Sequence, residues 1–306
     1  MRLESSLVWP KRLHWEKYFR PQNIPEALKI LEEFQGQARL LAGGTDLILQ
    51  IRKREIEPKV LVDITRIPGL SEIKLEEGVI RIGALVTHTQ VAQSPLLREK
   101  ALALSEGASQ LGSPQIRNVG TVAGNIVSGQ PGADTTIPLL ALDAKVKVMS
   151  KQGERIVPLT EFFLDTGKTV VESTREIVTE IFFSPQAKDE SSVSLRLARR
   201  KSLALPILNV SVVVSADAKQ KKFNHVKIAL GPVAPTPLRA REAEGILTSS
   251  PITDGVIKEA ARKAAQEANP RTSLLRGSGE YRKEMVKNLV ERAIHQALER
   301  LEARHG

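Results

Sequence analysis

The sequence of 306 residues contains no cysteine. Its absence excludes disulfides, cysteine nucleophiles and iron–sulfur clusters with cysteine ligands on this chain. The five histidines show no metal-ligand spacing, so no metal site is predicted. No apolar run approaches the roughly 20 residues that a membrane-spanning helix needs. The first ten residues include an acid and lack the apolar core of a signal peptide. We therefore expect a cytoplasmic protein without a membrane span.

Aromatic residues make up only 4% of the chain, too few for a platform on which nucleic-acid bases stack. The formal net charge of +10 would suit a nucleic acid, but the basic residues are scattered. They lie at 52–54, 199–201 and 219–222. We interpret these clusters as solvated helix faces and hairpin tips, or as a docking face for an acidic subunit or an anionic substrate. No nucleic-acid partner is predicted.

The length favours two domains. Apolar periodicity predicts the elements. Strands are expected at 39–42, 59–63, 79–85, 145–149, 176–183, 207–216 and 224–230. Helices are expected at 25–35, from 47, and at 88–93, 96–110, 254–267 and 280–304. In the last helix, Val286, Val290, Ile294, Ala297 and Leu301 form a core stripe or a partner seam. The polar stretch 188–192 after Ser184-Pro185 predicts domains at 1–186 and 187–306.

A first glycine segment, Leu41-Ala42-Gly43-Gly44-Thr45-Asp46-Leu47, lies between a predicted strand and a predicted helix. Glycine allows a ligand to approach the backbone closely. Free N–H groups at the start of the helix can bind a diphosphate without any basic side chain. The simpler interpretation is a turn in which Thr45 or Asp46 caps the helix. The segment alone favours neither.

A second segment, Gly120-Thr121-Val122-Ala123-Gly124-Asn125, again combines glycine with hydroxyl and amide side chains, and Asp134 follows nine residues after Asn125. The repetition predicts a site for a long cofactor that contains a diphosphate. The Asp134 carboxylate can accept hydrogen bonds from a polyol such as a ribityl chain. The alternatives are a glycine-rich bend with Asn125 as a local cap, and Asp134 as the cap of a short helix at 135–142.

The two commonest phosphate-binding frameworks are excluded. Neither segment has the G-x-G-x-x-G order of a dinucleotide fold, and no Gly-Lys-Ser/Thr of a P-loop follows either one. A phosphate-bearing cofactor must therefore be held in another way.

Four stretches resemble the FAD-binding medium subunit of the molybdenum hydroxylases, a family that includes xanthine dehydrogenase and carbon monoxide dehydrogenase. They are LLAGGTDLILQIRKRE, RNVGTVAGNIVSGQPGADTTIPLLALDA, RRKSLALPILNVSVVV and LLRGSGEYRKEMVKNLVERAIHQAL. The resemblance covers nearly the whole chain. It implies an α+β fold, with a two-part FAD-binding domain of the vanillyl-alcohol-oxidase (PCMH) type. A smaller α+β domain with an antiparallel sheet and helices follows.

The same resemblance implies which residues bind FAD. Its diphosphate would lie on the first segment, and Thr121, Gly124 and Asn125 would hold diphosphate and ribityl groups. Asp134 matches a ribityl or ribose acceptor. Weaker matches place Leu111 and Leu205 at the walls of the cofactor cleft, with Lys201 near it. In the first segment the implied residues are Ala42, Gly43, Gly44, Thr45 and Asp46, framed by Leu41 and Leu47.

The chain departs from the family pattern at Ala123, where the family usually has the first glycine of a Gly-Gly-Asn triplet. An alanine is accommodated if φ is negative there and clashes if φ is positive. Leu111 and Leu205 are aliphatic where some relatives use an aromatic ring, which weakens stacking on the cofactor.

The function implied is that of a flavoprotein electron-transfer subunit within a hetero-oligomer. The molybdenum cofactor would be on a large partner subunit and the [2Fe–2S] clusters on a small one. No catalytic side chain is predicted, because the flavin supplies the chemistry. One alternative is a stand-alone FAD-dependent reductase of the same fold, for which we find no convincing proton donor. Another is a scaffold that has lost FAD, which the intact glycine segments argue against.

Overall fold

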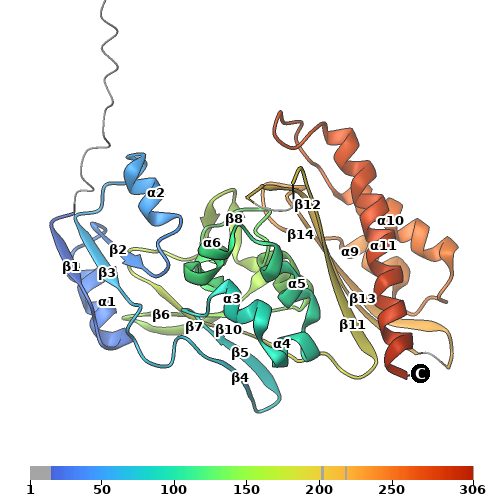
Figure 1. Cartoon of the computed structure of the whole chain (residues 1–306), viewed down its shortest axis with the longest axis horizontal. Helices are drawn as coiled ribbons and strands as arrows, with labels where there is room; N and C mark the ends of the chain where they lie inside the picture. The colour runs from blue at the N-terminus through green and yellow to red at the C-terminus, as the bar shows by residue number, and fades with distance from the viewer. Residues whose placement is uncertain (1–14, 201–202, 218, 306) are drawn as a thin grey trace, which may run out of the picture.

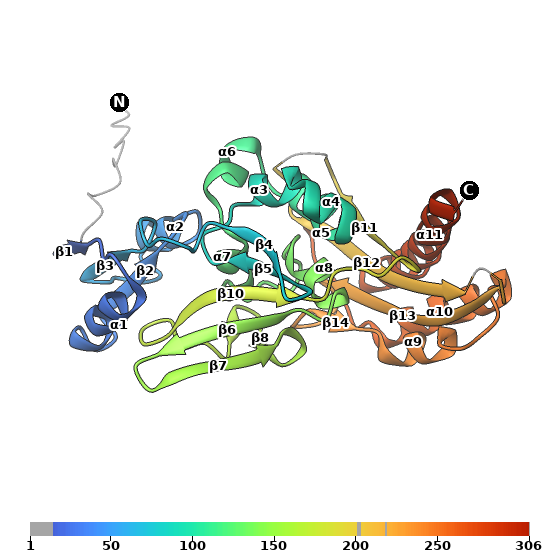
Figure 2. The same ribbon diagram turned by 90° about the horizontal axis from the view of Figure 1, so that it is seen from below.

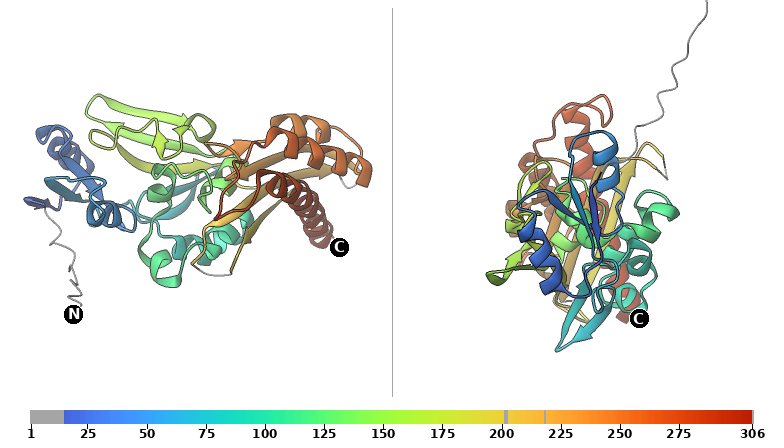
Figure 3. Two further views of the ribbon diagram at one scale, coloured as in Figure 1. Left: turned by 90° about the horizontal axis from the view of Figure 1, so that it is seen from above. Right: turned by 90° about the vertical axis from the view of Figure 1, so that its left-hand side faces the viewer.

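The computed structural model describes residues 15–200, 203–217 and 219–305. Figure 1 shows three regions that follow one another along the molecule: a small N-terminal unit, a central sheet covered by helices, and a C-terminal sheet with its own helices. Figure 3 places the N-terminal unit and helices α10 and α11 at opposite ends. One predicted site residue, Lys201, lies outside the described residues.

The N-terminal unit is a three-stranded parallel sheet, and one of its strands leads into the first glycine segment. Its strands are ordered β1 (Lys17–Phe19), β3 (Val60–Asp63), β2 (Ala38–Leu41). Helix α1 (Ile24–Glu33) begins at Asn23, whose side chain accepts a hydrogen bond from the Glu26 N–H. The chain leaves β2 at Leu41 and enters α2 (Leu47–Arg52) at Leu47. The predicted strand, glycine segment and helix are confirmed in this order.

The central region is a five-stranded antiparallel sheet with helices over one face (Figure 2). Its strands are β4 (Ile73–Glu76), β5 (Val79–Gly83), β10 (Ile177–Phe183), β6 (Lys145–Ser150) and β7 (Gly153–Pro158), in that spatial order. The helices are α3 (His88–Gln93), α4 (Pro95–Lys100), α5 (Leu102–Gln110), α6 (Pro114–Val119), α7 (Val122–Val127) and α8 (Thr136–Ala141). A short 3-10 turn (Leu159–Glu161) and the pair β8 (Phe163–Asp165) and β9 (Lys168–Thr169) complete it.

The single helix predicted over 96–110 is wrong. The chain breaks at Ala101 into α4 and α5. Tertiary hydrogen bonds explain the break, because the Gln186 N–H donates to the Lys100 carbonyl and the Ala103 N–H donates to Ser192 Oγ. These partners come from distant sequence, so local periodicity does not reveal them.

The bend proposed as an alternative for the second glycine segment is also wrong. The segment is a helix N-terminus, because Thr121 caps α7 by accepting a hydrogen bond from the Gly124 N–H at 3.0 Å. Helix α6, which precedes it, is capped in the same way by Ser113 and has Pro114 in its first turn. Both caps are visible in the sequence, but neither helix was predicted.

The C-terminal part is a four-stranded antiparallel sheet, β11 (Glu190–Ala198), β12 (Pro206–Asp217), β13 (Lys222–Gly231) and β14 (Leu238–Arg239). Helices α9 (Arg241–Leu247), α10 (Asp254–Glu267) and α11 (Gly279–His305) cover one face. Central helices α5 and α8 contact the sheet from the other side (Figure 1). Residues 206–215 of β12 are therefore all buried. The predicted α11 stripe is confirmed as core, since its members are at most 6% exposed.

The polar stretch 188–192, beside which the domain boundary is predicted, contains the start of β11 at Glu190. Ser191 and Ser192 are buried, and Ser192 Oγ donates to Gln186 Oε1. This hydrogen bond offsets the cost of burying the Ser192 hydroxyl, whereas Ser191 Oγ is buried without a partner among the described residues. The second part has a four-stranded sheet instead of the predicted strand pair.

The dipeptides Pro131-Gly132 and Gly231-Pro232 pack against each other where the central and C-terminal regions meet. A Cβ on Gly231 would lie 2.1 Å from the Pro131 carbonyl oxygen, and a Cβ on Gly132 would lie 2.7 Å from Pro232 Cδ. Each glycine therefore makes room for the proline beside the other. No larger residue fits at either glycine without separating the two regions.

Candidate functional site

The two glycine segments, far apart in sequence, lie against each other. A Cβ on Gly43 would be 1.9 Å from the Val119 carbonyl oxygen, so only glycine allows this approach. On the other side of the contact, a Cβ on Gly120 would be 3.7 Å from Thr45 Oγ1. The first segment thus packs directly on the junction between α6 and α7.

The first segment presents unpaired backbone donors. The N–H groups of residues 42–45 donate no hydrogen bond to any described residue, and these residues are half-buried. Gly44 has a left-handed φ of 69°, which turns the chain from β2 into α2. Consecutive free N–H groups at such a turn form a concave site for an anion.

The capping interpretation of this segment is wrong. Asp46 occupies the N-cap position of α2 with helical backbone angles, and no side-chain hydrogen bond caps this helix. The two flanking leucines bound the segment. Leu41 ends β2, Leu47 opens α2, and a Cβ on Gly44 would lie 3.1 Å from Leu41 Cδ1.

The second segment places its polar residues at the start of α7. Gly124 is exposed, Asn125 is half-buried, and Thr121 is buried beneath them. Ala123 lies inside the helix and is not among the residues with positive φ, so the alanine fits without strain. Asn125 is no cap. Its Oδ1 accepts from Thr135 Oγ1 at 2.7 Å, which ties the segment to the residue beside Asp134.

Asp134 lies at the junction with the C-terminal sheet. Its Oδ1 accepts from Arg196 Nε at 2.9 Å and from Asn209 Nδ2 at 3.0 Å. Burial raises the pKa of the Asp134 carboxyl, and Arg196 and Asn209 oppose that shift. The other oxygen, Oδ2, accepts no hydrogen bond from the described residues. Asp134 does not cap α8, where Thr135 is the N-cap.

The two predicted wall residues lie on neighbouring segments. Leu111 is 9% exposed and Leu205 is 65% exposed. The Leu203 N–H donates to the Gly112 carbonyl at 3.2 Å. This hydrogen bond joins the segment that carries Leu205 to the segment that carries Leu111. A continuous series of contacts therefore runs from the first glycine segment through α6, α7 and Asp134 to the start of β12.

His88 is a site residue that the sequence analysis missed. Its backbone N–H donates to the Gly120 carbonyl at 3.1 Å, and a Cβ on Gly120 would lie 3.4 Å from its ring. The imidazole is buried, and Nδ1 has no hydrogen-bond partner. Burial, helped by Arg117, lowers the pKa of His88 from 6.5 to about 4. A neutral imidazole therefore supports the second glycine segment. No local pattern marks it, because the contact with Gly120 is tertiary.

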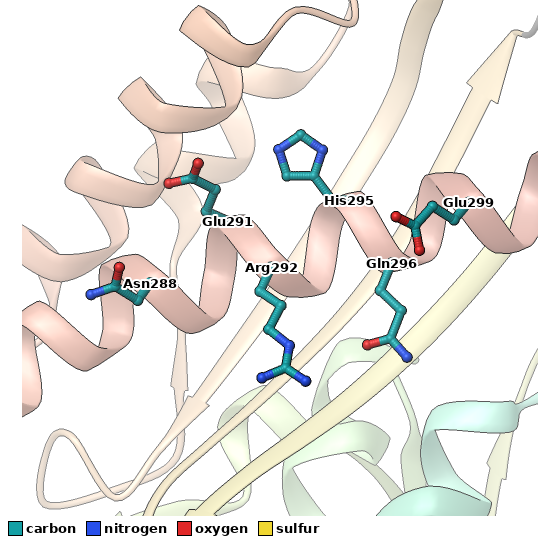
Figure 4. Close-up of a pocket in the computed structure, with 6 residues that line it drawn as sticks. All are labelled: Asn288, Glu291, Arg292, His295, Gln296 and Glu299. Atoms are coloured by element: carbon teal, nitrogen blue, oxygen red, sulfur yellow. The ribbon is translucent and has the colours of Figure 1, made fainter.

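A polar recess of about 590 Å³ lies elsewhere, along α11 (Figure 4). None of the predicted site residues lines it. Its lining residues are Asn288, Glu291, Arg292, His295, Gln296 and Glu299. We find nothing in its lining that relates it to the glycine segments.

Over the described ranges, no group of three or more His, Cys, Asp or Glu side chains is placed to hold a metal ion. Within those same ranges, no helix has the length and apolarity needed to cross a bilayer.

Comparison with known proteins identifies the family. Residues 12–186 match the model of the FAD binding domain in molybdopterin dehydrogenase, and residues 193–297 match the carbon monoxide dehydrogenase flavoprotein C-terminal domain. The xanthine dehydrogenase FAD-binding subunit of Escherichia coli O157:H7 is 32% identical over 283 residues, which are 92% of this chain and 95% of that protein. The nicotinate dehydrogenase FAD-subunit of Eubacterium barkeri is 32% identical over 290 residues, 94% of this chain and 97% of that protein.

Solved structures agree. A chain of carbon monoxide dehydrogenase from Hydrogenophaga pseudoflava superposes with a TM-score of 0.89 at 32% identity, over 94% of this chain and 98% of that one. A chain of the enzyme from Oligotropha carboxidovorans gives 0.87 at 29% identity, over 93% and 98%. The predicted α+β class, an FAD-binding domain followed by a C-terminal domain with an antiparallel sheet, is confirmed. The chain belongs to the FAD-binding subunits of the molybdenum hydroxylases and is an oxidoreductase subunit with FAD as its cofactor.

Proposed function

We propose that this chain carries electrons within a molybdenum hydroxylase. It would receive them from [2Fe–2S] clusters on a small subunit, while a large subunit holds the molybdenum cofactor. FAD, when bound, supplies the redox chemistry that passes electrons to an acceptor. The observation that carries the proposal is the contact between the two glycine segments, because it places unpaired N–H groups next to the N-terminus of α7. The cytoplasmic location stays a prediction.

The residues present fit a diphosphate joined to a polyol. We propose that the N–H groups of Ala42, Gly43, Gly44 and Thr45 bind the diphosphate, with Asp46 beside them and Leu41 and Leu47 framing the segment. A cradle of backbone donors needs no basic side chain, and Gly43 keeps it closed against α6. This chain's part is to bind and orient the cofactor.

We place the remaining predicted residues around the rest of the cofactor. Thr121, Gly124 and Asn125 lie at the exposed start of α7, where polar groups can reach the diphosphate or ribityl chain. The unpaired Asp134 Oδ2 can accept from a ribityl or ribose hydroxyl. Leu111 and Leu205 would wall the cleft, and Lys201 stays a proposed neighbour of it.

Asp134→Asn is expected to weaken FAD binding by roughly tenfold, with the fold retained. The amide keeps an oxygen for Arg196 and Asn209 but replaces the charged acceptor, and a hydrogen bond to a charged group is worth about 1.5–3 kcal/mol. Asp134→Ala should instead destabilise the protein, since the Arg196 side chain is only 6% exposed and would lose its counter-ion. Titration of the apo-protein with FAD, alongside urea unfolding of each variant, separates the two effects. FAD affinity unchanged in Asp134→Asn would remove Asp134 from the site.

The proposed function is tested with the purified full-length chain. We expect a yellow, FAD-containing protein that shows little turnover with purines, aldehydes or aryl-CoA thioesters unless its partner subunits are present. Robust oxidation of any of these by this chain alone would refute the division of labour. Rapid reduction by NADPH without partners would identify the stand-alone reductase. Failure of apo-protein to take up FAD would identify the scaffold.

A further inference from the structure

Two exposed leucines lie on an ordered turn just before α11. We call residues 273–277 the leucine turn. Leu274 is 97% exposed and Leu275 is 66% exposed. The turn is nevertheless closed by backbone hydrogen bonds in both directions between Ser273 and Gly277, at 3.0 and 2.8 Å. Ser273 Oγ also accepts from the Leu275 N–H at 3.2 Å. The fold thus holds two large apolar side chains in solvent, a feature of interaction sites when such side chains gather.

A third exposed leucine lies on the chain segment next to the leucine turn. Arg276 Nε donates to the Pro206 carbonyl at 3.2 Å, which joins the turn to the segment 203–206. On this segment Leu203 is 60% exposed and has a φ of 51°, a left-handed value uncommon for a bulky residue. Its N–H and its carbonyl are held by Gly112 and Arg200. The apolar surface therefore extends from the turn towards Leu111 and Leu205, the proposed walls of the cofactor cleft.

Arginines without a carboxylate partner lie on the leucine turn and on the segments that flank these leucines. No carboxylate of a described residue lies within 4.0 Å of Arg199, Arg200, Arg271 or Arg276. Arg199 donates instead to the Leu274 carbonyl at 2.6 Å. Arg276 is half-buried, and burial lowers the pKa of its guanidinium. The unpaired positive charge fits a partner whose apolar contact surface carries carboxylates.

We infer that the leucine turn, with Leu203 and these arginines, docks the iron–sulfur subunit. This inference rests on the proposed function. An electron donor has to approach the flavin closely, and this surface adjoins the proposed walls of its cleft. Carboxylates of the docked subunit would pair with Arg199, Arg200, Arg271 and Arg276, and its apolar side chains would cover Leu274 and Leu275.

The test compares the wild type with the double variant Leu274→Asp/Leu275→Asp. The control is Leu75→Asp, because Leu75 is 47% exposed on β4. Figure 1 shows β4 at the lower edge of the molecule, whereas the segment before α11 is at the upper edge. Each full-length chain, tagged, is expressed in its native host and purified through the tag. Iron, molybdenum and FAD are then measured per chain.

We expect the double variant to lose at least tenfold in iron per FAD, with FAD per chain unchanged. Leu75→Asp should match the wild type. Arg199→Glu/Arg200→Glu should lose iron to a similar extent at about 0.15 M salt, where charge pairing across an interface still acts. An iron content in the double variant equal to that of the wild type would overturn this inference but not the proposed function. Loss of molybdenum with iron retained would do the same. A wild-type chain that holds FAD but never iron would overturn the proposed function as well.

Discussion

Replacing Gly43 with alanine is expected to abolish FAD retention, with an affinity loss of at least a hundredfold. The new methyl group would lie 1.9 Å from the Val119 carbonyl oxygen, a backbone atom that no side-chain rotation can move away. The two glycine segments must then separate, and the N–H groups of residues 42–45 lose their position relative to α7. Since a binding site of this kind depends on preorganised donors, a shift of about 1 Å is sufficient to remove most of the affinity.

The measurement is a titration of apo-protein with FAD, followed by quenching of flavin fluorescence. Gly245→Ala is the matched control, because Gly245 lies in α9 and a Cβ there meets no atom within 4 Å. The control should bind FAD normally and be slightly stabilised, since alanine favours a helix. Far-UV circular dichroism distinguishes a local loss of the binding site from unfolding of the whole chain. Gly43→Ala with normal FAD affinity would mean that the two segments do not form the cofactor site.

Acidification is expected to destabilise the protein through His88. The pKa of His88 is about 4 in the folded protein and 6.5 when the ring is solvated. The unfolded chain therefore binds a proton that the folded chain excludes, and stability falls as pH falls from about 6.5 towards 4. The gap corresponds to about 3 kcal/mol, of which about 2 kcal/mol should be lost by pH 5.

Urea unfolding of wild type and His88→Gln at pH 7.5 and pH 5.0 isolates this contribution. Other groups titrate in both proteins, so the informative quantity is the difference in their pH dependence. His88→Gln has no ring to protonate and should lose about 2 kcal/mol less than wild type between the two pH values. Equal losses in the two proteins would show that His88 is not excluded from protonation.

The sequence predicts those elements whose apolar pattern is long. Helix α11 is an example, since its stripe from Val286 to Leu301 is buried as expected. The pattern fails where distant atoms decide the local structure. The helix over 96–110 breaks because Lys100 and Ala103 bond to residues beyond 185. Strand β11 was not predicted because serines such as Ser192, which is buried and hydrogen-bonded to Gln186, look in the sequence like those of a solvated linker.

The site was predictable as separate motifs but not as one arrangement. Glycine next to hydroxyl and amide residues marks both segments, yet the contact of Gly43 with Val119 exists only in the folded chain. The same holds for Asp134. Its carboxylate is visible in the sequence, while its buried pairing with Arg196 from β11 is not. Because of that pairing, Asp134→Asn tests FAD binding more directly than Asp134→Ala, which would leave Arg196 without its counter-ion.

The contact between Pro131-Gly132 and Gly231-Pro232 sets how closely the central and C-terminal regions approach each other. Here the Pro131 carbonyl oxygen fills the space above Gly231, and the Pro232 ring fills the space beside Gly132. A side chain added at either glycine would push the two regions apart. It would thereby also strain the ion pair between Asp134 and Arg196, whose two partners lie on opposite sides of this boundary.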